Sequence, residues 1–128
     1  MKGRAQLSGL LTLALTISVS APAKAGYVTG NDLFSDCGAD RSDNVYYQKS
    51  ARCTGYIVGA LDALEIDALL RGRPTCISAR VTVGQLRDIV MAYLTKNPQD
   101  RHMDASALVA VAINDAFQCS FLRSNPSP

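Results

Sequence analysis

Apolar residues recur at steps of three and four positions along most of the chain, the spacing that gathers them on one face of an α-helix. The longest such stretch covers residues 45–70 and predicts one amphipathic helix, which Gly72 and Pro74 end. Asp67 and Arg71 stand four residues apart near its end, so we expect them to pair. The apolar positions of this helix are Cys53, Tyr56, Ile57, Ala60, Leu61, Leu64 and Ala68. Because no convincing apolar–polar alternation is present, we expect helices without strands.

Two further helices are expected, one before the long helix and one towards the end of the chain. A short helix is expected over residues 31–35, with Thr29 or Asn31 able to cap its start. A longer one is expected over residues 104–117, with Asp104 as its cap. Little of this last helix is polar, so it is expected at the centre of the fold or at a subunit interface.

The remaining helix is marked by its start signal. Thr82 and Gln85 have the spacing of a capping box, and an apolar stripe follows them until Asn97 and Pro98 end the helix. The stripe consists of Leu86, Ile89, Val90, Tyr93 and Leu94. The chain shows no repeats and no linker, so we predict one all-α domain, a small bundle of about four helices.

Small residues recur every four positions within the long helix, at Gly55, Gly59 and Ala63. A helical glycine costs up to about 1 kcal/mol relative to alanine, so two of them on one face indicate that another helix approaches closely there. The alternative is that the helix merely tolerates them, because tertiary context often overrides propensity.

The first 25 residues have the three-part layout of a secretory signal peptide. Lys2 and Arg4 precede an uncharged, mostly apolar run over residues 7–19, and Ala23 and Ala25 then occupy the two positions that signal peptidase requires to be small. A transmembrane helix is the alternative, but it needs about 20 apolar residues. We therefore predict cleavage after Ala25 and export to the periplasm.

Cleavage would leave a helical domain over residues 26–122 and a disordered tail over residues 123–128. The whole chain carries 13 basic and 11 acidic residues, a net charge of +2. Lys2, Arg4 and Lys24 precede the cleavage point, so the mature chain has 10 basic residues against 11 acidic ones and a net charge of −1. With its basic residues scattered singly, we expect no nucleic-acid partner and no stable membrane anchor.

The chain has four cysteines, all in the exported part: Cys37, Cys53, Cys76 and Cys119. An even number in an oxidising compartment predicts two disulfides, hence a disulfide-stapled bundle. The spacings are too wide for a zinc site, and His102 is the single histidine, so we expect no metal. Three pairings are possible, and the sequence alone does not choose between them. We favour Cys37–Cys53, which ties the short first helix to the long one, and Cys76–Cys119, which ties a loop to the chain end.

The residues that catalysis needs are not evident in the sequence, so we expect neither an enzyme nor a cofactor. His102 lies in a polar loop, where a lone histidine is typically a solvated or contact residue. Asp62 and Glu65 share a helix face, which we interpret as solvated, although Asp62 could instead be a buried, hydrogen-bonded acid. The sequence therefore favours an exported protein whose function is binding.

The ordered landmarks of the chain resemble a known family. They are GNDLF ahead of Cys37, CTGYIVGALDAL from Cys53, CISARVTVGQL from Cys76, IVMAYLTKNP ending at Pro98, and ALVAVAINDAFQC closing at Cys119. Together they resemble the Rap/Tai immunity proteins, periplasmic antidotes to the peptidoglycan amidase effectors of type VI secretion systems. One departure is Gln118, which stands where the family pattern has proline before the last cysteine.

The resemblance implies a helical fold, often a homodimer, that blocks a secreted peptidoglycan amidase effector by occluding its active site. Contact residues do not transfer, since each antidote is matched to its own toxin. We expect the polar loop to supply the probing surface, through Asn97, Gln99, Asp100, Arg101 and His102. Reversing the charges of its aspartate and arginine should then weaken toxin binding without loss of fold. The alternative is that the loop is only a connector.

A different function class also fits a small, exported, disulfide-containing helical chain. A periplasmic chaperone-like or structural protein of the acid-stress type would loosen at low pH and coat many unfolded clients. An antidote would instead stay folded and bind one partner with a dissociation constant of about nanomolar or tighter.

Overall fold

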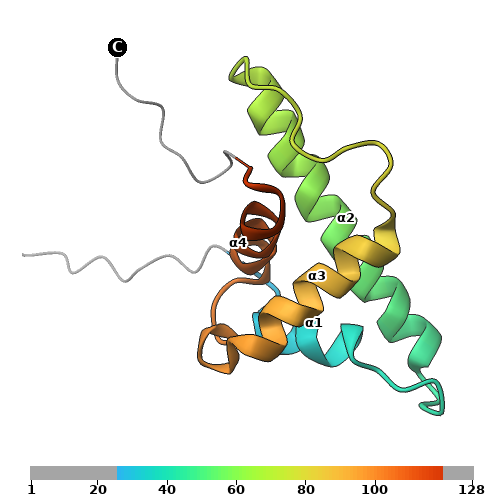
Figure 1. Ribbon diagram of the computed structural model, residues 1–128. Helices are drawn as coiled ribbons and strands as arrows, with labels where there is room; N and C mark the ends of the chain where they lie inside the picture. Colours follow the sequence, from blue (N-terminus) through green and yellow to red (C-terminus); the bar gives the residue numbers. More distant parts are fainter. Residues whose placement is uncertain (1–25, 120–128) are drawn as a thin grey trace, which may run out of the picture.

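The computed structural model describes residues 26–119, and these form four α-helices and one short 3-10 helix. The elements are α1 (Gly30–Cys37), α2 (Tyr46–Leu70), α3 (Val83–Lys96), η1 (Pro98–Asp100) and α4 (Ala105–Phe117). The α3 helix crosses the long α2 helix, and each of the four α-helices contacts the other three (Figure 1). The predicted all-α bundle is confirmed. The predicted signal peptide and tail lie outside the described residues.

Local side-chain signals set the starts of two of the four α-helices. Thr29 and Asp32 form a capping box at α1, as Thr82 and Gln85 do at α3. The predicted capping box of α3 is therefore confirmed, and of the two candidate caps of α1, Thr29 is the one used. At α4, Asp104 occupies the cap position but its side chain makes no capping hydrogen bond.

The centre of the bundle is apolar and is filled by residues from all four α-helices. The largest fully buried side chains are Leu33, Ile57, Leu94, Leu108, Ile113, Val90, Val109 and Cys53. Six of the thirteen residues of α4 are buried, so this helix is central in the fold, one of the two positions predicted for it. No described helix is both long and apolar enough to cross a lipid bilayer.

Two disulfides join the helices at the pairings favoured from the sequence. Cys37–Cys53 links the last residue of α1 to α2. Cys76–Cys119 links the segment before α3 to a cysteine two residues beyond the end of α4. Their Cα atoms lie 5.0 Å and 5.5 Å apart, respectively, within the usual range for disulfides. No described cysteine is free.

Candidate functional site

The loop between α3 and α4, which the sequence predicted as the probing surface, is organised around the side chain of Arg101. Its Nε donates to the carbonyl of Leu94 at 2.6 Å, and its guanidinium lies 3.6 Å from the centre of the Phe34 ring. Its backbone carbonyl accepts a hydrogen bond from Asn31 N at 2.7 Å. Arg101 thus ties α3 and the loop to α1, and the expectation that its charge can be reversed without loss of fold stays a prediction.

The other predicted residues of the loop divide into structural and exposed ones. Asn97 Nδ2 donates to the Tyr93 carbonyl at 2.9 Å, and the Tyr93 hydroxyl donates to Asp100 at 3.3 Å. Burial, and then the charge of Asp100, raise the pKa of Tyr93. Gln99 and His102 are exposed, with His102 Nδ1 2.8 Å from the carbonyl of Gln99. Asn97 thus has a structural contact within the loop, and binding of a partner through this loop stays a prediction.

The small residues of α2 face outward. Gly55, Gly59 and Ala63 are exposed, and among the described residues no atom of a neighbouring element lies within 4 Å of the place a Cβ would take at Gly55 or Gly59. The prediction that another helix of this chain packs closely there is therefore wrong. The buried face of α2 is instead formed by Cys53, Ile57, Leu61 and Ala68.

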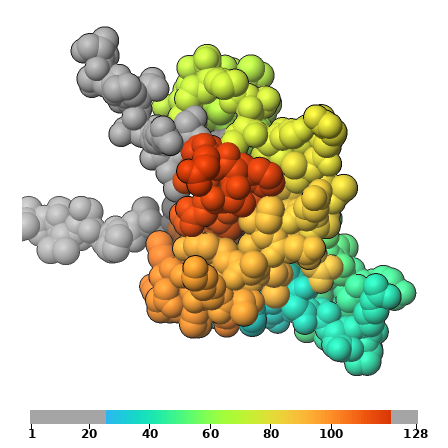
Figure 2. All heavy atoms as spheres, viewed as in Figure 1, coloured from blue at the N-terminus to red at the C-terminus, as the bar shows by residue number. Residues whose placement is uncertain are grey.

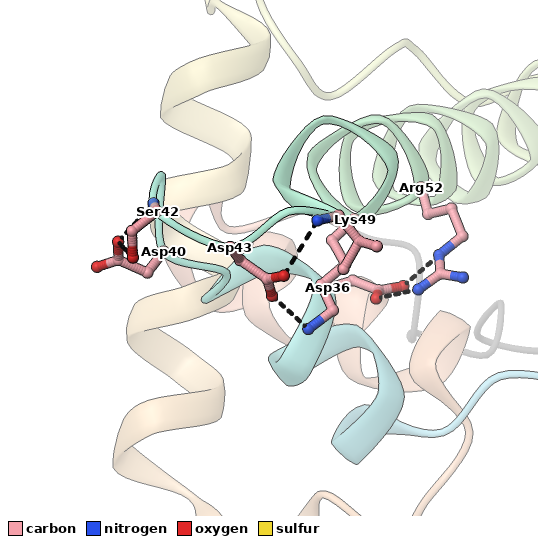
Figure 3. A network of polar contacts seen from close by, with 7 residues as sticks. Asp36, Asp40, Ser42, Asp43, Lys49 and Arg52 are labelled. Atoms are coloured by element: carbon pink, nitrogen blue, oxygen red, sulfur yellow. Dashed lines mark hydrogen bonds and ion pairs between the residues drawn. The ribbon is translucent and has the colours of Figure 1, made fainter.

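A first candidate binding surface lies between α1 and the start of α2, where acidic and basic side chains are already paired (Figure 3). Asp36 accepts from Arg52 at 2.6 Å, and Asp43 from Lys49 at 3.0 Å. The backbone N–H of Val45, and then Lys49, hold the pKa of Asp43 below its ordinary value. The charges of this surface therefore compensate one another and leave little net charge for a partner.

A second candidate surface, the α2–α3 groove, lies between the C-terminal part of α2 and the start of α3. It consists of two adjoining hollows of about 390 Å³ each, which share three lining residues. The shared residues are Asp62, Glu65 and Thr75. Figure 2 shows the end of α2 and the segment that follows it at one edge of the molecule. The remaining lining residues are Val58, Leu61, Ile66, Leu69, Ile77, Ser78, Ala79, Val83 and Leu86.

One wall of the α2–α3 groove is held by Glu65, whose role the sequence did not reveal. Its carboxylate accepts hydrogen bonds from the backbone N–H groups of Cys76 and Ile77, at 2.9 Å and 3.0 Å. The expectation that Glu65 belongs to a solvated face is therefore wrong, because its carboxylate holds the backbone of the segment before α3. Asp62 is exposed, so the alternative of a buried acid is wrong.

The described surfaces present side chains suited to contact with another protein. Within residues 26–119, no three His, Cys, Asp or Glu side chains are grouped so that they could hold a metal ion. The described cysteines are in disulfides, and the imidazole of His102 contacts a backbone carbonyl. What these surfaces can do chemically is bind another protein through apolar contacts and charge pairs.

Comparison with known proteins gives one match. The family model described as Rap1a immunity proteins matches residues 29–119. Neither the curated proteins nor the solved structures include a match to the chain. The matched segment begins at the cap of α1 and ends at the second cysteine of the Cys76–Cys119 disulfide, so it covers the whole bundle.

Proposed function

The chain belongs to the family of Rap1a immunity proteins, and from that premise we propose that it is an exported antidote to a secreted effector. The effector is a peptidoglycan amidase of a type VI secretion system, and the antidote binds it in the periplasm and occludes its active site. The single observation that carries this proposal is the family match, which spans all four helices of the bundle.

The architecture supports binding by a preformed surface. Two disulfides tie the helices and the connecting segments together, so few groups need to be ordered when a partner docks. Export fits the same picture, because disulfides persist in an oxidising compartment and residues 1–25 have the layout of a signal peptide. The resemblance also leads us to propose a homodimer, which light scattering of the purified chain tests directly.

A protection assay tests the proposed function. Cells that receive in their periplasm the peptidoglycan amidase effector recovered with this chain in a pull-down should survive when they also express the full chain. They should lyse when they express a matched chain without residues 2–25, because that form stays in the cytoplasm, away from the effector. Lysis with both forms would contradict the proposal.

A pull-down separates this function from the chaperone-like alternative. The antidote should recover one stoichiometric partner, the amidase, because it is matched to a single toxin. Recovery of a broad set of unfolded clients, without a single stoichiometric partner, would favour the acid-stress type of protein instead.

A further inference from the structure

Exposed apolar side chains gather around the α2–α3 groove. Of the seven exposed large hydrophobic residues in the described part of the chain, Ile66, Leu69 and Val83 line it. Leu70, with 82% of its surface exposed, is the last residue of α2. Exposed apolar groups that cluster in this way are typical of a protein-contact site.

The acidic residues next to this groove differ in whether their carboxylates already have hydrogen-bond or ion-pair partners. Glu65 accepts two backbone hydrogen bonds, and Asp67 pairs with Arg71 at 2.8 Å and with Arg73 at 3.5 Å. Asp62 makes no hydrogen bond or ion pair with any other described residue. Asp62 is therefore an uncompensated carboxylate at the rim of a mainly apolar groove.

The wall of the α2–α3 groove opposite α2 is fixed before any partner arrives. The Cys76–Cys119 disulfide anchors it to the end of α4, and Glu65 holds two of its backbone N–H groups. The capping box of Thr82 and Gln85 fixes the start of α3 at its far end. A preformed groove of this kind avoids the free-energy cost of ordering a loop on binding.

We propose that the α2–α3 groove is the surface that docks the amidase effector, with apolar side chains of the effector in the groove and a cationic group paired with Asp62. This inference rests on the proposed function. The stem peptides of peptidoglycan carry free carboxylates, so an enzyme that holds them needs cationic groups around its cleft, and Asp62 is complementary to those groups. The other surfaces fit less well, because the charges between α1 and α2 are already paired and Arg101 in the α3–α4 loop faces inward.

Charge reversal at Asp62 tests the inference. The variant Asp62→Lys and its matched control Asp88→Lys both replace an exposed helical aspartate that makes no hydrogen bond or ion pair with another described residue. Asp88 lies outside the groove. The probe is the purified peptidoglycan amidase effector that the wild-type chain recovers in the pull-down, and the measurement is isothermal titration calorimetry. Asp62→Lys should weaken binding at least about tenfold, whereas Asp88→Lys should bind as the wild type does.

A second variant tests the apolar half of the docking surface. Leu69→Ser should also weaken binding at least about tenfold, whereas Tyr47→Ser, at an exposed position on the first turn of α2, should leave the affinity unchanged. Raising the salt concentration should weaken binding of the wild type more than binding of Asp62→Lys, because the proposed charge pair is screened. Circular dichroism melting confirms that every variant remains folded.

The possible outcomes separate the two proposals. If the wild-type chain does not bind the effector, the proposed function fails, and the groove assignment fails with it. If the wild type binds but Asp62→Lys and Leu69→Ser bind equally well, only the groove assignment is overturned. It is also overturned if Leu69→Ser converts a dimer into a monomer without changing the affinity for the effector, because the groove then docks a second copy of this chain.

Discussion

Two glycines of this chain should respond to alanine substitution in opposite directions. Gly30 is buried, and a Cβ there would overlap Leu108 Cδ1 and lie 2.9 Å from both the Cα and the carbonyl oxygen of Arg101. The backbone cannot easily shift, because Gly30 N donates to the Met103 carbonyl at 2.9 Å and Asn31 N to the Arg101 carbonyl at 2.7 Å. Overpacking of this kind costs roughly 1–3 kcal/mol, so Gly30→Ala should lower the free energy of unfolding by that amount.

Gly59 supplies the matched control, because it is also a helical glycine but faces open space. Alanine there gains helix propensity and meets no neighbour, so Gly59→Ala should raise the free energy of unfolding by about 0.5–1 kcal/mol. For a domain of this size, each kcal/mol shifts the melting temperature by about 4–8 °C.

Urea unfolding followed by circular dichroism, with both disulfides intact, measures the two changes. The measurement is repeated at several protein concentrations, so that any association becomes visible. An alanine at position 30 that leaves the stability unchanged would refute the packing argument. A loss of stability in Gly59→Ala, growing with protein concentration, would show that another copy packs against this face of α2.

Three further changes test other parts of the structure. Replacing Cys76 and Cys119 by serine opens a link across 43 positions, which should lower the free energy of unfolding by about 4 kcal/mol in urea titrations; an unchanged midpoint would contradict this. The pKa of Asp43 is lowered from 3.8, so the stability that its carboxylate contributes should be complete above about pH 5 and be lost as the pH falls through the lower folded-state pKa. The stability difference from Asp43→Asn should therefore vanish in acid titrations, and a difference that persists in acid would contradict this. Arg101→Ala should destabilise the fold by roughly 1.5–3 kcal/mol and His102→Ala by almost nothing, and equal melting temperatures would contradict that difference.

The helices were predictable because their signals are local. The capping box of Thr82 and Gln85 spans four residues, and the apolar periodicity of α2 is a property of the helix itself. The four cysteines allow three disulfide pairings, and the sequence alone does not choose between them. The favoured pairing agrees with the structure because the helix order brings Cys37 close to Cys53.

The errors concern features that depend on where an element points in three dimensions. Periodicity placed Gly55 and Gly59 on one face of α2 but could not show whether that face meets a helix or solvent. The acceptor role of Glu65 depends on how the chain returns along α2 after Gly72, which no local pattern encodes. Arg101 looked like a surface charge, because its partner Phe34 lies more than sixty positions away in the sequence. Candidate contact residues therefore required the structure, although the family was recognisable from the ordered motifs.

Titration of the purified, oxidised chain into the peptidoglycan amidase effector that it recovers in the pull-down tests the proposed function most directly. Calorimetry in parallel with peptidoglycan hydrolysis should show saturable binding of about nanomolar dissociation constant or tighter, equivalent to roughly −12 kcal/mol. Hydrolysis should fall in proportion to the bound fraction and stop when all the effector is bound. Absence of binding, or tight binding that leaves hydrolysis at its full rate, would contradict the proposal that this chain is an antidote that occludes the active site.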